Sequence, residues 1–251
     1  AGSMRIGGYV GGRFVLAGGA GNYTDRIIRS ADGGVTWVED TLPAAAQVYT
    51  MRRVGNELWA GTSTATYYRT SDGDTWSTHT GPGNALAAAG VGTLVAGVDL
   101  SGALHESTDG GSTWAAVDVN AAAGRTGLYA YQVEAYRGVL VAFVYATSGG
   151  NPRMVLVREP GGAWTPYTLP SSYSEPDLIL QVAGVLYMVD GSGDVFYTTD
   201  GKAWGGGTDN IAASISPPDS YTRYVQVHDD WAGAFLPALE KAPPIARYPG
   251  A

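Results

Sequence analysis

The sequence predicts an all-β fold, a single β-propeller of four-stranded antiparallel blades, because one short motif recurs at the length of a blade. Copies of a Ser/Thr-x-Asp-Gly segment ending in Trp lie at residues 30–37, 70–76, 107–114 and 198–204, with a degenerate copy at 159–164. The closing tryptophans, at positions 37, 76, 114, 164 and 204, follow one another at spacings of 39, 38, 50 and 40 residues. Repeats of roughly 40 residues are typical of four-stranded propeller blades.

A turn glycine followed by an apolar stretch precedes each copy of the motif. These glycines are Gly12, Gly55, Gly92, Gly138 and Gly184. Each predicts a hairpin turn that opens a buried strand. In the second repeat we expect strands at 48–54, 58–62 and 66–70, then the motif as the next hairpin, and an outer strand from Trp76. The other four repeats follow the same plan.

The ends of the chain depart from this repeating pattern. Five repeats occupy residues 4–210, and the remaining segment, 211–251, carries no copy of the motif. Residues 221–235 nevertheless repeat the strand, turn and strand pattern of 129–143, which predicts a sixth, atypical blade; the alternative is five blades with a C-terminal extension. Residues 1–3 read as a vector remnant before Met4, so we expect one domain over 4–251 and no signal peptide. This favours a virion or cytoplasmic location over classical secretion.

Composition excludes several classes of function. The chain has 23 acidic and 15 basic residues, a net charge of -8 and scattered arginines, which predicts no nucleic-acid partner. No apolar run approaches the roughly 18 residues of a membrane-spanning helix, so membrane insertion is not expected. Cysteine is absent, and the three histidines are isolated from one another in the sequence, at His79, His105 and His228. We therefore expect no metal site, no cofactor and no Ser-His-Asp triad.

The recurring motif resembles the Asp-box, or BNR repeat, of the sialidase-like superfamily, whose members are propellers. The Asp carboxylate can accept hydrogen bonds from the following backbone N–H groups, Gly supplies the left-handed conformation, and Trp fills the gap between sheets. The resemblance implies that the boxes occupy hairpins between third and fourth strands, opposite the usual ligand-binding face. The structural residues are then Asp32, Trp37, Asp72, Trp76, Asp109, Trp114, Trp164, Asp200 and Trp204.

Ligand-binding residues are expected on the opposite face, in loops between second and third strands and in connections between blades. The candidates are Asn22, Tyr23, Asp25, Arg26, Asp99, Tyr145, Asn151, Arg153, Tyr173, Glu175 and Asp190. The chain has 16 tyrosines and only four phenylalanines, a bias found in sugar-stacking and adaptable binding surfaces. Tyrosine at half-exposed strand positions is the alternative explanation.

A catalytic function rests on one short segment. Met4-Arg5-Ile6-Gly7 is similar to the sialidase signature that begins the first blade, which would make Arg5 a carboxylate-binding arginine and Asp25 a candidate acid. The aromatic residue and proline of that signature are missing, and two further arginines and a tyrosine nucleophile cannot be assigned.

The sequence therefore favours a non-catalytic module that recognises a glycan or a protein surface, for example a receptor-binding or tail-associated protein of a phage. The alternatives are a small exo-glycosidase of sialidase type and an assembly factor that binds a partner protein. The oligomeric state stays open.

Overall fold

The computed structural model describes residues 4–18, 26–44, 46–146, 150, 152–173 and 176–210. The chain forms two compact units, Ala1–Thr168 and Leu169–Ala251. Five four-stranded antiparallel sheets occupy the described residues, four in the first unit and one in the second, and each is built from four consecutive strands. The predicted blade at 211–251 lies outside the described residues. Six blades and a single domain over 4–251 both stay predictions.

The strands of the first unit fall into four groups. The first sheet comprises β1 (Met4–Val10), β2 (Arg13–Gly18), β3 (Arg26–Ser30) and β4 (Val38–Thr41). The second comprises β5 (Val48–Val54), β6 (Glu57–Thr62), β7 (Thr66–Thr70) and β8 (Ser77–Thr80). The third comprises β9 (Ala87–Val91), β10 (Leu94–Val98), β11 (Leu104–Ser107) and β12 (Ala115–Val117). The fourth comprises β13 (Leu128–Tyr136), β14 (Val139–Ala146), β15 (Met154–Arg158) and β16 (Trp164–Thr168).

The second unit contributes the fifth sheet. It comprises β17 (Pro176–Val182), β18 (Val185–Asp190), β19 (Asp194–Thr198) and β20 (Gly205–Asn210). Each of the five turn glycines predicted from the sequence has a positive φ, between +61° at Gly55 and +83° at Gly138, and separates the first two strands of its sheet. The glycines adopt this left-handed conformation without the clash that a Cβ causes. The predicted hairpins are therefore present.

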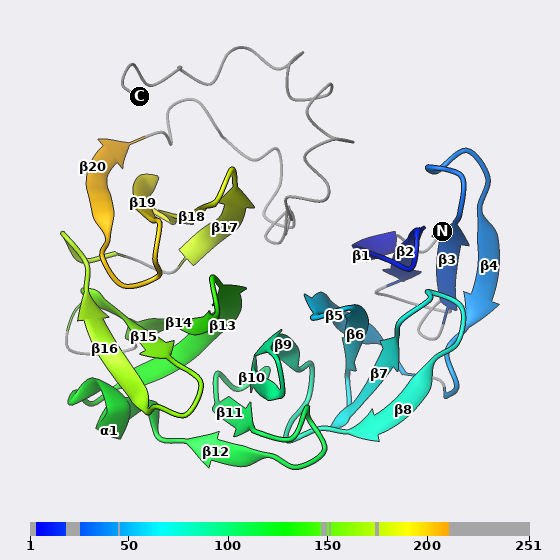
Figure 1. The fold of residues 1–251 in the computed structure, drawn as a ribbon, viewed down its shortest axis with the longest axis horizontal. Helices are drawn as coiled ribbons and strands as arrows, with labels where there is room; N and C mark the ends of the chain where they lie inside the picture. The colour runs from blue at the N-terminus through cyan, green and yellow to red at the C-terminus, as the bar shows by residue number, and fades with distance from the viewer. Residues whose placement is uncertain are drawn as a thin grey trace. The chain divides into compact units, whose positions relative to one another are not determined.

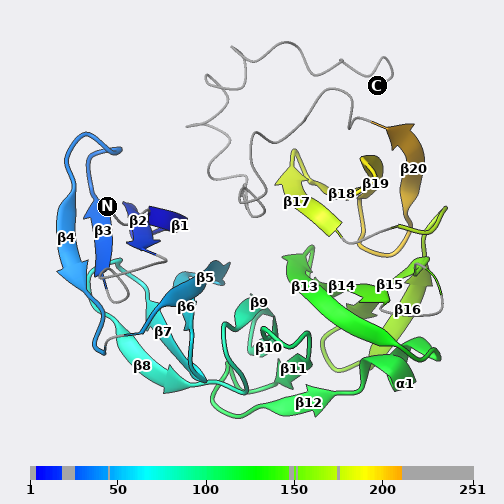
Figure 2. The ribbon, with the colours of Figure 1, turned by 180° about the vertical axis from the view of Figure 1, so that it is seen from behind.

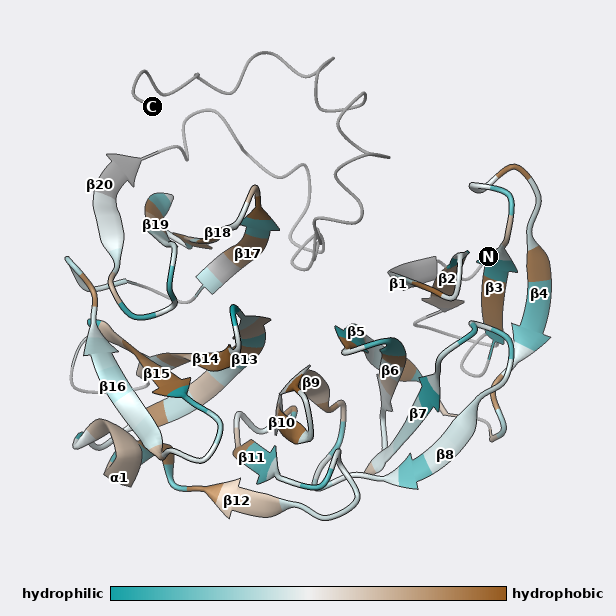
Figure 3. Ribbon diagram, in the orientation of Figure 1, coloured by the Kyte–Doolittle hydropathy of each residue, from teal (hydrophilic) through white to brown (hydrophobic). Residues whose placement is uncertain are grey.

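The four sheets of the first unit form an arc (Figure 1). Strands β1, β5, β9 and β13 lie on its inner side, and β4, β8, β12 and β16 on its outer side. Apolar clusters fill the junctions between the first and second, second and third, and third and fourth sheets. Figure 3 shows the resulting contrast between the apolar β14 and the hydrophilic outer strand β8. The core of this unit thus lies between sheets rather than at one central point.

The inner strands β1, β5 and β13 share a β-bulge near their start. The register shifts between Met4 and Ile6, between Val48 and Thr50, and between Ala130 and Gln132. Strand β9 pairs regularly over its whole length. The extra residues are Arg5, Tyr49 and Tyr131, and a bulge turns the side chains beside it away from ordinary alternation.

A buried ion pair connects two inner strands that are separated by a third. Arg52 Nη1 of β5 lies 3.3 Å from Glu134 Oε1 of β13, and the two residues are 8% and 2% exposed. Strand β9 lies between them, in contact with both strands. Its residue at the equivalent position, third from the end of the strand, is Ala89. Ala89 itself is buried in the apolar cluster between the third and fourth sheets.

One element was not expected from the sequence, a short helix in the connection between the third and fourth sheets. Helix α1 (Val119–Ala123) packs against β13 and β16 (Figure 2). Asp118 caps its N-terminus by accepting a hydrogen bond from Ala121 N, and Gly124 ends it at φ +62°. Asp and Gly at these positions are common helix caps, so the local sequence did carry the information.

Candidate functional site

The motif aspartates are engaged inside their own turns. Asp32 accepts hydrogen bonds from Thr36 N at 2.8 Å and from Thr36 Oγ1 at 2.6 Å, and Asp109 accepts the same pair from Thr113. Asp72 accepts from the backbone of Asp74 and Thr75, and Asp200 from Lys202 and Ala203. Each turn joins the third strand of its sheet to the fourth.

These hydrogen bonds stabilise the ionised carboxylates. The contacts with Thr36 lower the pKa of Asp32 from its usual 3.8 to about 2. The backbone N–H groups of Thr75 and Asp74 lower the pKa of Asp72 to about 2. The pKa of Asp109 falls well below its usual value because of Thr113. Charges held this firmly by their own turns have a structural use and little capacity left for a ligand.

The motif tryptophans differ in burial. Trp76 packs against the apolar cluster shared by the first and second sheets, Trp114 against that of the second and third, and Trp164 against that of the third and fourth. Trp37 is 41% exposed, so the expectation that every motif tryptophan fills a gap between sheets is wrong for this residue. Trp76, Trp114 and Trp164 each pack against the cluster shared with the preceding sheet, whereas no sheet in the described part of the first unit precedes the first.

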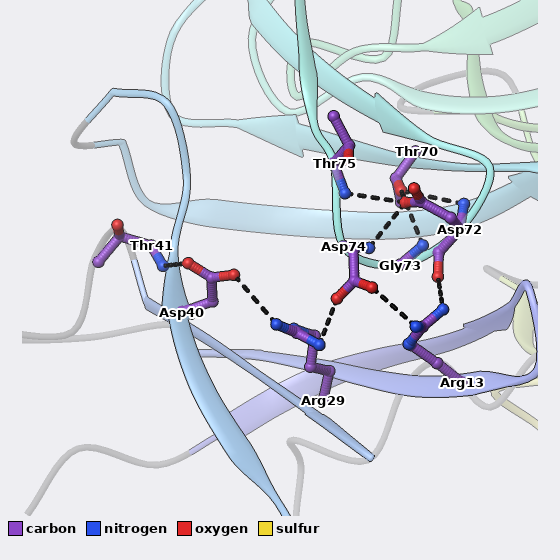
Figure 4. Close-up of polar contacts among 9 residues, drawn as sticks. All are labelled: Arg13, Arg29, Asp40, Thr41, Thr70, Asp72, Gly73, Asp74 and Thr75. Atoms are coloured by element: carbon purple, nitrogen blue, oxygen red, sulfur yellow. Dashed lines mark hydrogen bonds and ion pairs between the residues drawn. The ribbon is translucent and has the colours of Figure 1, made fainter. Parts of the chain in front are cut away.

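Charged side chains join the first sheet to the motif turn of the second (Figure 4). Arg13 Nη2 lies 2.7 Å from Asp74 Oδ2, and Arg13 Nη1 donates to Asp72 O at 2.7 Å. Arg29 forms an ion pair with the other oxygen of Asp74 and lies 3.7 Å from Asp40 Oδ2. The side chains alternate in charge and are a quarter to two-fifths exposed. These partly buried ion pairs of alternating charge therefore clamp the first sheet to the second.

The residue immediately before the motif Ser or Thr makes a comparable contact between the third and fourth sheets. Glu106 precedes Ser107 and accepts two hydrogen bonds from Arg158 of the fourth sheet. Arg69 precedes Thr70 but lies over the ring of Trp59 in its own sheet, 3.8 Å from the ring centroid. The position before the motif therefore identifies Arg29 and Glu106 as clamp residues, a relationship that the sequence interpretation had missed.

The opposite ends of the sheets present a different kind of surface. The turn between β10 and β11 contains Asp99, whose Oδ1 accepts from Ser101 N at 2.9 Å, Ser101 Oγ at 2.6 Å and Ala103 N at 3.1 Å. His105 Nε2 lies 3.1 Å from Asp99 Oδ2. Burial raises the pKa of Asp99, but the hydrogen bonds from Ser101 and His105 outweigh it, and the pKa lies below its ordinary value. This network fixes the turn and leaves Leu100 at its tip, 71% exposed.

The fixed turn is bonded to the start of β13. Ala130 N donates to Gly102 O at 2.9 Å. Gly102 has a φ of +79°, and a Cβ there would lie 3.2 Å from Tyr129 Cβ. Tyr129 is 41% exposed, and its ring centroid lies 5.7 Å from that of Tyr145, which also contacts Tyr131 at 6.1 Å. A rigid apolar tip thus stands beside a group of tyrosines.

A second set of contacts extends this surface to the second sheet. Leu100 N donates to Asn84 O, and Ala85 N donates to Thr62 O. Thr50 Oγ1 donates to Leu86 O at 2.6 Å, and the preceding residue, Tyr49, is the bulge residue of β5 and is 42% exposed. Tyr49, Leu100 and Tyr129 therefore lie along one hydrogen-bonded path across three sheets. We call these three residues the Tyr-Leu-Tyr strip.

The predicted ligand-binding residues have varied positions. Asp99 and Tyr145 lie beside the strip, whereas Arg26 forms an ion pair with Glu39 on the first sheet, and Arg153 is exposed just before β15. Tyr173 is fully buried against Phe196, and so is not displayed at the surface as the sequence predicts. Asp190 is 3% exposed and accepts hydrogen bonds from the backbone of Ser192 and Asp194.

The side chains of the remaining predicted residues lie outside the described part of the structure. Arg5 is placed by its backbone alone, at the bulge of β1. Asn22, Tyr23, Asp25, Asn151 and Glu175 lie outside the described residues. Their binding roles stay predictions. Tyr49, Leu100 and Tyr129 were not among the candidates; the apolar residue inside the polar Asp99–Ser101–Gly102 turn was the available indication of Leu100.

Comparison with known proteins supports the fold. Residues 8–126 match a family described as the DUF6242 beta propeller domain. Among curated proteins, no sequence matches this chain. The chain is similar in structure to YCF48 from Cyanidioschyzon merolae, with a TM-score of 0.51 and 16% identity over 82% of this chain and 85% of that one.

Two further solved structures are similar. YCF48 bound to D1 peptide gives a TM-score of 0.53 and 19% identity over 81% of this chain and 68% of that one. A streptogramin B lyase structure gives a TM-score of 0.61 and 14% identity over 91% of this chain and 73% of that one. With the sheets described above, these matches show a β-propeller of four-stranded antiparallel blades. Membership of the sialidase-like superfamily stays a prediction.

No group of three or more His, Asp or Glu side chains in the described part of the chain could hold a metal ion. Within the same residues, no helix is long and apolar enough to cross a membrane.

Proposed function

We propose that this β-propeller is a recognition module that binds a partner protein through the Tyr-Leu-Tyr strip. The observation that carries the proposal is the exposure of Leu100, 71%, at the tip of a turn held by four hydrogen bonds to Asp99. An apolar side chain fixed at a loop tip loses little conformational entropy on binding, and it gains from being covered.

The chemistry of the strip favours a protein over a glycan. A sugar site combines an aromatic platform with polar groups that bond the hydroxyls, and such groups must be free to do so. The carboxylate nearest the strip, that of Asp99, is already engaged in its own turn. A peptide offers apolar side chains to Leu100 and backbone carbonyls to tyrosine hydroxyls. One of the structures with a similar fold, YCF48 bound to D1 peptide, holds a peptide, and this supports a protein partner over a glycan.

The remaining functional hypotheses depend on other residues. A sialidase-type reaction requires Arg5 and Asp25, whose side chains are not described. A phage receptor-binding role requires a partner on the surface of a host cell. Both stay predictions.

The test is to screen the full chain against a displayed library of random peptides and against a broad glycan array. We expect peptides to be retained, retention to be lost in the Leu100→Asp variant, and retention to persist in Val35→Asp. Val35 is the matched control because it is an apolar residue, 81% exposed, in a motif turn of the first sheet. Retention on glycans alone, or peptide binding that Leu100→Asp leaves intact, would contradict the proposal.

A further inference from the structure

The turn that carries Leu100 uses its own main-chain donors. All five N–H groups of residues 99–103 donate hydrogen bonds inside the protein. Their acceptors are Asp99 O, Asp99 Oδ1, Ala103 O and Asn84 O. The hydroxyl of Ser101 is engaged as well, since it donates to Asp99 Oδ1 at 2.6 Å. The turn therefore has no N–H group left for a carbonyl of a ligand.

The main chain on both sides of the turn is engaged in the same way. Near the start of β13, Ala130 N donates to Gly102 O at 2.9 Å. In the connection between the second and third sheets, Ala85 N donates to Thr62 O at 2.6 Å. An extended peptide binds by exchanging main-chain hydrogen bonds with its partner, and a peptide carbonyl that is buried without a donor costs free energy. These N–H groups cannot take part in such an exchange.

The fifth sheet contains the same turn without the leucine. Asp190 Oδ1 accepts hydrogen bonds from Ser192 N and Asp194 N, each at 2.9 Å. The position of Leu100 is taken there by Gly191. The turn therefore forms without an apolar side chain, and the side chain of Leu100, 71% exposed, is an addition that the turn itself does not require.

An α-helix is the peptide conformation that needs no main-chain partner. Its N–H and C=O groups bond to one another except in the first and last turns. Its side chains at positions i, i+3, i+4 and i+7 lie on one face, and in helix packing a hole between four such side chains accepts a single leucine. A helix with an apolar stripe thus suits a turn that offers an exposed leucine and no free N–H group.

The charge of the surface favours the apolar face of such a helix. The three side chains of the Tyr-Leu-Tyr strip are uncharged, and the side chain of Asp99 beside them is only 11% exposed. Charged side chains of a ligand find no exposed counter-charge in the strip. Affinity must therefore come from covering Leu100, Tyr49 and Tyr129 with apolar side chains.

We propose that the Tyr-Leu-Tyr strip binds an amphipathic α-helix of the partner protein, with Leu100 inserted between four apolar side chains on one face of that helix. This inference rests on the proposed function and specifies its partner.

Fluorescence polarisation with three labelled peptides tests the inference on the full chain. The first peptide has leucines at i, i+3, i+4 and i+7 and is locked as a helix by a lactam between two polar side chains. The second replaces a central polar residue of the first with proline, which breaks the helix. The third rearranges the first so that leucines alternate with polar residues. We expect the first to bind at least about tenfold more tightly than either of the others, because its helix is pre-formed.

Leu100→Gly removes the inserted side chain and recreates the turn of the fifth sheet, so this variant should keep its fold. It should weaken binding of the first peptide by about tenfold or more. The matched control is Tyr197→Ala, which removes a tyrosine that is 46% exposed on β19 and should leave the affinity unchanged.

Equal affinity for the first two peptides, or preference for the alternating peptide, would overturn this inference and leave a peptide-binding function intact. The same holds if the random library selects peptides that require Leu100 but carry central prolines. If none of the three peptides binds and the library also yields nothing, the proposed function fails as well. A loss of affinity in Tyr197→Ala equal to that in Leu100→Gly would also overturn the inference, because the helix would then contact another surface.

Discussion

Arg158 on β15 holds the carboxylate of Glu106 on β11 through two hydrogen bonds, from Nε to Oε2 at 2.7 Å and from Nη2 to Oε1 at 2.9 Å. The side chains are 9% and 16% exposed, so the pair joins the third and fourth sheets largely out of contact with water. The hydrogen bonds to Glu106 raise the pKa of Arg158. Parallel hydrogen bonds between guanidinium and carboxylate are the strongest form of such a pair.

Arg158→Ala should reduce the free energy of unfolding by about 2–4 kcal/mol, because it leaves the Glu106 carboxylate buried without its partner. Urea unfolding followed by tryptophan fluorescence measures this. The double variant Arg158→Met with Glu106→Met should recover part of the loss. Arg26→Ala is the control, since its pair with Glu39 is about half exposed and should contribute less than about 1 kcal/mol. Equal costs for Arg158→Ala and Arg26→Ala would show that burial of the first pair is irrelevant.

The motif aspartates predict a loss of stability in acid. Their pKa values in the folded chain are below the usual 3.8, about 2 for both Asp32 and Asp72. Their stabilising contribution is therefore complete above about pH 4 and is lost as the pH falls towards 2, because the unfolded chain binds protons first. Asp32→Asn should flatten the pH dependence of the free energy of unfolding between pH 4 and 2.

A second variant separates the carboxylate from its hydrogen bonds. Thr36→Val keeps Asp32 but removes the hydroxyl that contributes most to lowering its pKa. We expect its pH dependence to lie between those of the wild type and Asp32→Asn. Identical profiles for all three proteins would mean that this turn does not contribute to acid unfolding.

Gly102→Ala should be more damaging than alanine at a comparable glycine. Both Gly102, at φ +79°, and Gly110, at φ +73°, have left-handed backbones. An added Cβ at Gly102 meets Tyr129 Cβ and Ala130 O, each at 3.2 Å, whereas nothing lies within 4 Å at Gly110. In denaturant unfolding, we expect Gly110→Ala to lower the free energy of unfolding by about 1 kcal/mol and Gly102→Ala to lower it by about 1 kcal/mol more. Equal losses in the two variants would show that the contact with Tyr129 adds no strain.

The motif tryptophans should differ in energetic importance. Trp76→Ala removes a ring from the cluster between the first and second sheets and should cost about 3 kcal/mol. Trp37→Ala removes a ring that is 41% exposed and should cost about 1 kcal/mol. Chemical denaturation of the two variants measures the difference. A cost for Trp37→Ala that matches Trp76→Ala would show that Trp37 is covered in solution.

The sequence predicted the repeating part of the fold well because the repeat is built from local rules. In the second repeat, strands expected at 48–54, 58–62 and 66–70 appear as β5, β6 and β7, with only the start of β6 one residue earlier. Turn glycines and the Asp-Gly motif fix such hairpins through the backbone alone. Trp37 was misjudged because the burial of a ring depends on the neighbouring sheet, which no local pattern contains.

The candidate site was predicted only in outline. The sequence indicated the loop end of the sheets and named Asp99 and Tyr145 beside the strip, but it treated Asp99 as a ligand contact. Its carboxylate accepts hydrogen bonds from Ser101, Ala103 and His105, and these partners are visible only once the turn is folded. Tyr49 and Tyr129 became candidates through a bulge and a close approach to Gly102, and neither feature has a sequence pattern of its own.

Because Arg52 of β5 pairs with Glu134 of β13, the second, third and fourth sheets are not interchangeable copies of one repeat. The strand between β5 and β13 is β9, which carries Ala89 at the equivalent position. A copy of β5 or β13 moved into the third repeat would put an arginine or a glutamate in place of this alanine, and a copy of β9 in place of β5 or β13 would remove one member of the pair. Repeats that look interchangeable on paper therefore could not be shuffled, duplicated or replaced by a consensus blade without first rewriting the inner strands around them.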